Sequence, residues 1–381
     1  MTTTKNNEHK KLNFSSEREQ NQACLNSAEH EKNQGRKVLN VPNLRFKEFQ
    51  GEWEKCKLGD YGKVVTGNTP PTKDIENYEN GTYLWASPAD LGTIKLISET
   101  KTMLSAKGFS KTRALPKGSV LVTCIGSTIG KTGMATKEMS TNQQINSIVV
   151  NENSDNEFVY YSIQSAFPRY LSSIAVQAVP IISKSAFELL PNQRPCLQEQ
   201  KKIGKMLSLL DERIATQNKI IEDLKKLKSA IIENVFDDKH SERLQLDNVG
   251  SYIRGLTYSS NDVVEHGGTL VMRSNNIVNG SLLDYNNNVV FVNKQMSAEQ
   301  QLQNGDIVIC MANGSSSLVG KSSFYDGNCH SPITVGAFCG IYRSKEPIVK
   351  WLFQTNKYRR YIWNSLQGGN GAIANLNGED I

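Results

Sequence analysis

The chain has 381 residues, of which 38% are hydrophobic and 22% are charged, a composition typical of globular proteins with two or three domains. Its net charge is +6 and its pI is about 8.8, so a polyanionic partner is compatible with the charge but not required by it. No apolar run approaches the length of a membrane span, and the N-terminus carries no signal-peptide core, which predicts a cytoplasmic protein.

The seven cysteines are scattered, their number is odd, and no Cys-x-x-Cys pair occurs. Cys329 and His330 are adjacent, which is not a usual spacing for zinc ligands. The cysteines therefore predict reduced thiols, and we expect no metal site.

Residues 1–41 are rich in Lys, Asn, Glu, Gln and Ser and poor in large apolar side chains. Such a segment buries too little surface to offset the entropy lost on ordering, so we predict a disordered polar tail. Residues 42–190 then form a mixed α/β domain, in which strand-like runs such as Ser119–Cys124 and Ser147–Val150 alternate with Gly, Pro and Asn turns.

Residues 191–238 are predicted to form a long helix. From Cys196 to Phe236 the only glycine is Gly204, and there is no proline. Apolar residues recur at alternating spacings of four and three, which indicates a coiled-coil seam. The seam positions are Ile203, Leu207, Leu210, Ile214, Ile221, Leu224, Ile231 and Val235, with Gln217 and Lys228 in two polar slots.

Residues 239–381 again show the mixed α/β pattern. They resemble the first domain, which predicts a duplicated domain. Four matches occur in the same order: Leu58–Gly62 with Leu246–Gly250, Leu115–Gly118 with Leu302–Gly305, Gly130-Lys131 with Gly320-Lys321, and Arg169–Leu171 with Arg360–Ile362. The predicted fold class is an α/β (α+β) tandem repeat joined by a long coiled-coil-type helix. At this register the chain ends where a second long helix is expected to begin.

Two similar domains joined by a rod suggest recognition of two patches on one long ligand, and duplex DNA is such a ligand. Amide side chains suit adenine, whereas Arg and Lys suit guanine or phosphate. The candidate DNA contacts are Lys131, Asn142, Gln143, Gln144 and Asn146 in the first domain, and Arg273, Asn275, Asn276, Lys321, Arg359 and Arg360 in the second. Each cluster also reads as an ordinary polar turn or solvated helix face.

Two segments resemble catalytic motifs but depart from them in spacing or residue type. Gly126–Thr132 resembles a phosphate-binding P-loop, but its glycines are one residue too close. Asn68–Thr72 resembles the Asn-Pro-Pro-aromatic motif of amino-methyltransferases, but it contains an extra Thr and no aromatic residue follows. No nuclease core, catalytic triad or dinucleotide fingerprint is recognisable, so we expect no catalytic residue.

The sequence resembles the specificity subunits of type I restriction-modification enzymes. Asn43–Phe46, Gly51–Trp53 and Leu115–Lys131 resemble the family's first target-recognition domain. Pro195–Gly204 followed by Leu209–Ile214 resembles the start of its central spacer helix. The resemblance covers residues 42–381.

The resemblance implies two target-recognition domains, each reading one half of a bipartite site in double-stranded DNA. It further implies docking of two modification (methyltransferase) subunits and of restriction (motor-nuclease) subunits in phage defence. S-adenosylmethionine, ATP and Mg²⁺ are then expected on those partners, and no cofactor is expected on this chain.

The chain departs from the family pattern because the second spacer helix is absent. We therefore expect the seam to form an exposed apolar stripe in an isolated chain, and to pair with a second copy or a separate chain. Two other readings remain open: a coiled-coil scaffold that does not bind DNA, and an enzyme in its own right.

Overall fold

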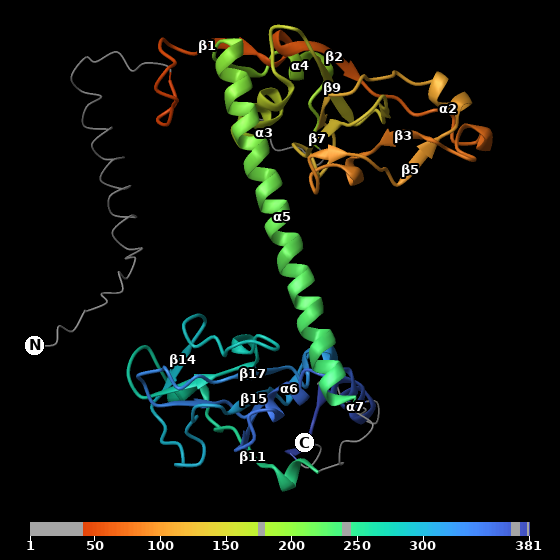
Figure 1. Ribbon diagram of the computed structural model, residues 1–381. Coiled ribbons are helices and arrows are strands. Elements are labelled where there is room, and N and C mark those ends of the chain that lie inside the picture. Colours follow the sequence, from red (N-terminus) through yellow and green to blue (C-terminus); the bar gives the residue numbers. More distant parts are fainter. Residues whose placement is uncertain (1–40, 174–179, 238–244, 367–373, 379–380) are drawn as a thin grey trace, which may run out of the picture. The chain divides into compact units, whose positions relative to one another are not determined.

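The computed structural model describes residues 41–173, 180–237, 245–366, 374–378 and 381. The predicted polar tail lies outside the described residues except for Val41. The chain divides into two compact units, Met1–Ile214 (unit 1) and Ala215–Ile381 (unit 2), which are described separately below and share the helix α5 (Figure 1).

Unit 1 is built around a five-stranded sheet with the strand order β2-β9-β6-β7-β4 and a three-stranded sheet with the order β5-β3-β8. A short pair, β1-β10, lies beside them. The strands are β1 (Glu54–Lys57), β2 (Gly62–Thr66), β3 (Tyr83–Ala86), β4 (Leu96–Ile97), β5 (Thr102–Leu104), β6 (Val120–Thr123), β7 (Thr132–Ala135), β8 (Ser140–Thr141), β9 (Ile145–Val150) and β10 (Pro191–Arg194).

The helices of unit 1 are α2 (Ala106–Ser110), α3 (Asn156–Ser173), α4 (Lys184–Glu188) and the first half of α5 (Leu197–Phe236), with short 3-10 turns η2 (Leu58–Tyr61), η3 (Ile75–Asn77) and η4 (Pro88–Asp90). Helix α3 contacts β6 and β7, and α4 contacts β2, whereas α2 contacts β5 and η3. The apolar run of β6 is buried along its whole length, as expected for a central strand covered on both faces. Phe158, Ile163 and Phe167 of α3 join the same core.

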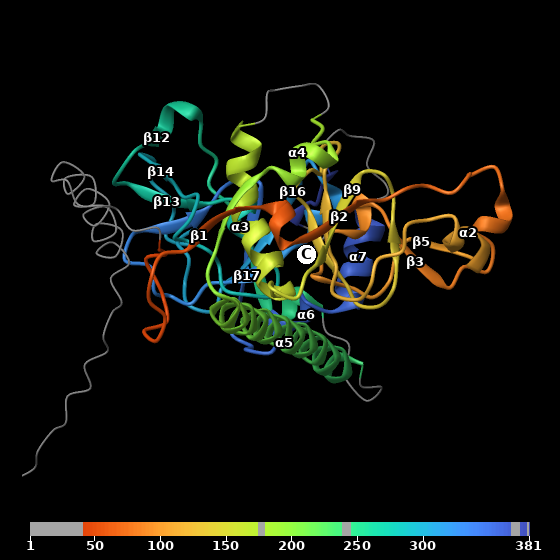
Figure 2. The same cartoon turned by 90° about the horizontal axis from the view of Figure 1, so that it is seen from above.

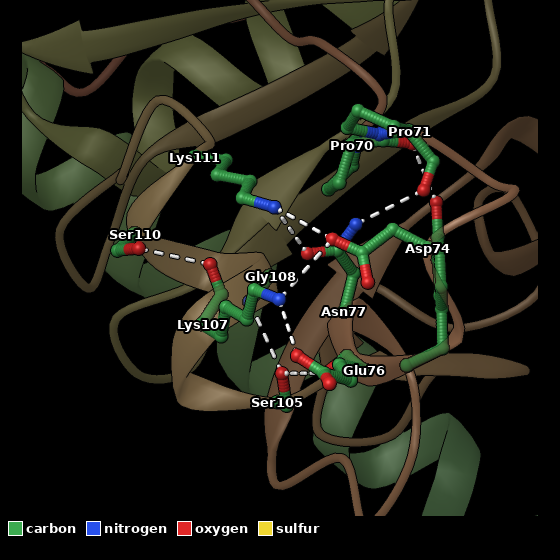
Figure 3. A network of polar contacts seen from close by, with 11 residues as sticks. Pro70, Pro71, Asp74, Glu76, Asn77, Ser105, Lys107, Gly108, Ser110 and Lys111 are labelled. Carbon is green, nitrogen blue, oxygen red and sulfur yellow. Dashed lines mark hydrogen bonds and ion pairs between the residues drawn. The ribbon is translucent and has the colours of Figure 1, made fainter.

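A polar network holds the segment between β2 and β3 against α2, at the end of unit 1 away from α3 and α4 (Figures 1 and 2). Asn77 is fully buried. Its amide donates to the carbonyl of Pro71 at 2.9 Å, and its side-chain oxygen accepts from Lys111 Nζ at 2.8 Å (Figure 3). Lys111 also pairs with Asp74 at 3.0 Å. Because a buried amide with both ends bonded tolerates little movement, the network fixes the path of the preceding loop.

Unit 2 contains a four-stranded sheet ordered β11-β19-β15-β17, another ordered β12-β14-β13-β18, and a pair β16-β20. Its strands are β11 (Gly250–Arg254), β12 (Val263–Val264), β13 (Thr269–Met272), β14 (Val290–Val292), β15 (Ile307–Cys310), β16 (Ala312–Asn313), β17 (Ser322–Phe324), β18 (Ile333–Val335), β19 (Cys339–Ser344) and β20 (Ala374–Asn375). Its helices are α6 (Val349–Leu352) and α7 (Asn356–Leu366), with 3-10 turns η5 (Leu246–Asn248), η6 (Ser260–Asp262), η7 (Ser274–Asn276) and η8 (Ser316–Leu318).

The two units share one strand order and pairing pattern, as the duplicated motifs predict. We call this shared arrangement the frame. The order β2-β9-β6-β7 of unit 1 recurs as β11-β19-β15-β17, and β5-β3-β8 recurs as β14-β13-β18 with the same pairing directions. One predicted correspondence is wrong. The main-chain position of Gly130 lies against Phe167, and that of Gly320 lies against Ile362, so Ile362 corresponds to Phe167 and not to Leu171. The match of Arg169–Leu171 with Arg360–Ile362 is displaced by about one helical turn.

Helix α5 is continuous over 40 residues, Leu197–Phe236. In unit 1 it is fixed by Arg45, which donates two hydrogen bonds to the fully buried carboxylate of Glu199 at 2.8 and 2.7 Å. Gly204 lets Asp155 and Phe158 approach the helix axis, since a Cβ there would lie 2.5 Å from Asp155 Oδ1. The predicted fold class, a mixed α/β tandem repeat joined by a long helix, is confirmed.

Candidate functional site: one sheet edge in each unit

The strand registers of unit 1 bring three loops to one edge of the five-stranded sheet. Thr66 at the end of β2 pairs with Asn146, and Thr123 at the end of β6 pairs with Ile145 at the start of β9. Segments 67–69, 124–131 and 142–145 therefore emerge side by side, and we call them the unit 1 edge. Main-chain bonds join them: Asn68 N donates to Thr141 O at 2.9 Å, and Cys124 N donates to Gln144 O at 2.7 Å.

Unit 2 presents the equivalent edge, formed by segments 255–258, 311–321 and 336–339. Leu256 N donates to Val335 O at 2.7 Å, and Met311 N donates to Phe338 O at 2.9 Å. These bonds repeat those of unit 1 position by position. The unit 2 edge thus has the same main-chain scaffold as the unit 1 edge, with different side chains.

Glycines allow the loops to approach so closely. A Cβ on Gly67 would lie 2.2 Å from the carbonyl oxygens of Thr141 and Asn142, and a Cβ on Gly255 would lie 2.2 Å from that of Gly336. Both distances are far inside van der Waals contact, so a side chain would push the loops apart. The two glycines correspond in the repeat, and each unit therefore needs one at this position.

The predicted amide cluster of unit 1 divides into buried and accessible members. Asn142 and Asn146 are buried, and their side chains bond to Gln144 and to Thr66 Oγ1 and Ile182 O. They shape the loop. Gln143 is exposed and Gln144 is partly exposed, so these two amides are the ones a ligand reaches.

The same division holds in unit 2. Asn276 is buried, and its amide donates to Asp284 O at 3.0 Å and to Asn287 O at 2.8 Å. Arg273 and Asn275, which precede it in the chain, are exposed. Arg273 and Asn275 line a groove of about 430 Å³ with Tyr258 and Phe338, which lies along the unit 2 edge.

The two predicted lysines lie at the same place in each frame. Lys131 is exposed directly before β7, with its aliphatic stem against Gly92. Lys321, directly before β17, lines a hollow of about 250 Å³ together with Arg359 and Trp363 of α7. Arg360 is exposed on the same helix. Each edge is therefore flanked by cations, which suits contact with phosphate.

Three edge residues were missed from the sequence. Phe338 is 66% exposed at the position that corresponds to Gln144, and Tyr258 lies beside it in the groove. Arg113 donates to the carbonyl of Thr66 at 2.6 Å, so its exposed guanidinium is held beside Gly67. A correct register for the repeat after β17 would have placed Phe338 opposite Gln144.

The motifs that suggested catalysis make local structural contacts. Lys131 is followed by a strand, whereas the lysine of a P-loop opens a helix whose N-terminus faces the phosphates. The side chain of Asn68 bonds to Lys111 O at 2.9 Å and accepts from Arg113 N at 3.0 Å. Burial raises the pKa of the Cys124 thiol to about 12, which disfavours the thiolate form of this edge cysteine.

In the described ranges, no group of three or more His, Cys, Asp or Glu side chains is arranged to hold a metal ion. Among the described helices, none is long and apolar enough to cross a bilayer.

The predicted seam of α5 is largely exposed. Ile203 and Leu207 are partly covered by unit 1, whereas the other six seam residues are 47–58% exposed: Leu210, Ile214, Ile221, Leu224, Ile231 and Val235. In unit 2 the stripe continues into a groove of about 720 Å³ that also includes Ile348 and Trp351. The expected apolar stripe is therefore present.

Comparison with known proteins shows which proteins parts of this chain resemble. Residues 50–226 match the family model of the type I restriction modification DNA specificity domain. This segment holds the unit 1 edge and the start of α5, and it is similar to that domain.

Several curated proteins are similar to part of the chain. The chain is 30% identical over 193 residues to the Type I restriction enzyme MjaIX specificity subunit of Methanocaldococcus jannaschii, covering 49% of this chain and 44% of that protein. It is 33% identical over 126 residues to the HindI specificity subunit of Haemophilus influenzae, covering 32% and 27%. The chain thus spans less than half the length of these curated relatives.

The fold is similar to that of the crystal structure of a type I restriction-modification system S subunit from M. genitalium. The TM-score is 0.55 at 16% sequence identity, and the alignment covers 88% of this chain and 83% of that one. The likeness extends over both units and supports the tandem fold.

Proposed function

We propose that this chain is the DNA-recognition subunit of a type I restriction-modification complex, with each unit reading one half of a bipartite site in double-stranded DNA. The observation that carries the proposal is the pair of equivalent edges. Each edge holds accessible polar side chains on a rigid main-chain frame with cations beside it. Recognition of base edges requires such preorganised groups, whereas phosphate contacts set position and most of the affinity.

The accessible candidates take separate roles in this proposal. Lys131, Lys321, Arg359 and Arg360 contact phosphates, while Gln143, Gln144, Arg273 and Asn275 face bases. Three buried, hydrogen-bonded amides hold the loops that carry these side chains: Asn142, Asn146 and Asn276. The chain performs no covalent step. Modification subunits supply S-adenosylmethionine chemistry, and restriction subunits supply ATP and Mg²⁺.

The apolar stripe of α5 is proposed to pair with a helix of another chain. Six exposed apolar side chains at heptad spacing fit a partner helix, and a second copy of this chain is the first expectation. Sedimentation of the purified chain tests this expectation. A dimer at micromolar concentration supports it, and a chain that remains monomeric at every concentration measured contradicts it.

The test of DNA recognition uses the chain in complex with its modification subunits. Binding to duplex DNA is measured across a salt series for the double variant Lys131→Ala/Lys321→Ala. If each lysine contacts one phosphate, the slope of log affinity against log salt falls by about 2 in total.

The matched control is Lys137→Ala/Lys345→Ala. Lys137 is exposed beyond the far end of β7, and Lys345 is exposed beyond the far end of β19, so the control removes the same charge away from both edges. Unchanged affinity and slope in the Lys131/Lys321 variant would favour the alternative function, a scaffold that binds partners through α5 without reading DNA.

A further inference from the structure

One loop of each edge has the same main-chain hydrogen bonds but different side chains, and it joins β8 to β9 in unit 1 and β18 to β19 in unit 2. Its main chain is held identically in both. Asn142 N donates to Ala86 O at 2.9 Å and Gly336 N donates to Met272 O at 2.8 Å. The loop closes with Ile145 N on Asn142 O at 3.2 Å in one unit, and with Cys339 N on Gly336 O at 2.8 Å in the other.

These main-chain bonds define the correspondence of side chains. Asn142, Gln143 and Gln144 of unit 1 stand where unit 2 has Gly336, Ala337 and Phe338. The frame therefore presents two amides at one edge and one aromatic ring at the other. Because the scaffold is the same, the difference lies in what each loop offers to a ligand.

In unit 1 the two amides are oriented before any ligand arrives. Gln143 Oε1 accepts from Thr69 Oγ1, and Gln144 Oε1 accepts from Asn142 Nδ2 at 3.0 Å. An amide oxygen has two lone pairs, so each Gln keeps an acceptor position and an NH₂ group for a ligand. A paired donor and acceptor in one plane match the N7 and N6 edge of adenine in the major groove.

In unit 2 the same position carries Phe338, whose ring is 66% exposed. It lines the edge groove with Arg273 and Tyr258. Arg273 donates to Asn288 O at 3.2 Å through one terminal nitrogen, and this contact steadies the guanidinium. An apolar ring suits the C5-methyl group of thymine, and a guanidinium suits the O6 and N7 of guanine.

We infer that this loop determines the base preference of each unit: residues 141–144 read adenine through Gln143 and Gln144, and residues 335–338 contact a thymine methyl through Phe338 with Arg273 on a neighbouring guanine. The inference rests on the proposed function. It extends that function by naming one loop in each unit and the bases it recognises.

The experiment selects bound sequences from a duplex DNA pool with randomised positions, using the chain in complex with its modification subunits. Gln143→Ala/Gln144→Ala should relax selection for adenine in one half-site by about tenfold to a hundredfold, since one good bidentate contact discriminates by that factor. The other half-site should not change. Phe338→Ala should relax thymine selection in the opposite half-site only.

An exchange of side chains makes the test sharper. Phe338→Gln should convert selection for thymine into selection for adenine in the unit 2 half-site. Two control variants truncate an exposed glutamine and an exposed apolar side chain elsewhere, Gln164→Ala on α3 and Leu282→Ala in unit 2. Both should leave the selected sequence unchanged, and thermal unfolding checks that every variant is folded.

The outcomes separate the two proposals. If the wild-type complex selects a bipartite sequence but the loop variants leave both half-sites unchanged, or alter both equally, the inference about the loop is overturned and the proposed function stands. If the wild-type complex selects no sequence at all, the proposed function fails and the inference fails with it.

Discussion

Unit 1 and unit 2 share a frame but fill it differently, and the difference shows which parts of the sequence specify the fold. Ser119 and Val149 of unit 1 stand where unit 2 has Asp306 and Arg343, by the register of β6 with β9 and of β15 with β19. In unit 2 these residues form an ion pair at 2.7 Å, with the carboxylate almost fully buried. The main-chain bonds around both pairs are the same. The frame thus depends on its hydrogen-bond ladder and apolar core, and it accepts unlike side chains at one position.

The largest expected effect tests whether the units are stable independently. Leu121 of β6 is fully buried, and its counterpart Val308 is fully buried in unit 2. Leu121→Ala should destabilise unit 1 by about 3 kcal/mol through lost burial and a residual cavity. Proteolysis during thermal unfolding, with fragments identified by mass, should show earlier cleavage in unit 1 and unchanged cleavage in unit 2. Equal loss in both units would contradict the division.

The ion pair of unit 2 provides the second test. Arg343→Val leaves the buried Asp306 carboxylate without its partner and should cost about 3 kcal/mol. The double variant Arg343→Val/Asp306→Ser installs the pair found in unit 1, and it should recover most of that loss because no charge is left buried. Denaturant unfolding measures both. A double variant as unstable as the single one would show that the two frames are not interchangeable at this position.

Replacing the corresponding glycines Gly67 and Gly255 should destabilise the protein less, and each replacement should affect only its own edge. Gly67→Ala and Gly255→Ala each force a Cβ against carbonyl oxygens, at a cost of roughly 2 kcal/mol for overpacking. Each should also weaken selection in its own half-site while sparing the other. Gly314→Ala is the control for the stability measurement alone, since a Cβ there meets no atom within 4 Å although the residue lies in the unit 2 edge. Loss of selection in both half-sites from either variant would indicate that the edges do not act separately.

The smallest effect concerns how unit 1 holds α5. Tyr161 donates to Asp211 Oδ2 at 2.5 Å and receives a bond from Lys95 at 3.1 Å. Tyr161→Phe should cost about 1 kcal/mol, with no change in unit 2, where Glu233 instead accepts from the backbone of Asn356. Hydrogen exchange along α5 measures this: faster exchange near Asp211 alone is expected, and faster exchange along the whole helix would contradict it.

The sequence predicted the features that follow from periodicity. The heptad seam from Ile203 to Val235 lies within the observed helix, and the turn glycines Gly118 and Gly305 belong to equivalent positions with positive φ. Features that depend on neighbours distant in sequence were not predictable. Asn142, Asn146 and Asn276 look like any loop amide, and only the folded chain shows that they are buried.

The register error after β17 has a physical cause. Helix α3 is continuous in unit 1, whereas unit 2 has α6 and α7 with a break between them, and an insertion in the loop between β17 and β18 shifts the alignment. The triplets Arg169–Leu171 and Arg360–Ile362 were matched because their residue types are alike. The true correspondence follows from the side chains that pack against Gly130 and Gly320. The same shift concealed Phe338.

The loop between β8 and β9, like its counterpart between β18 and β19, is anchored through peptide groups, which every amino acid other than proline provides in full. Replacing its outward-facing residues therefore costs little folding free energy. Under the proposed function, side chains at these positions can change which bases are read without changing whether the protein folds. A new target would then require only a few point mutations, one half-site at a time.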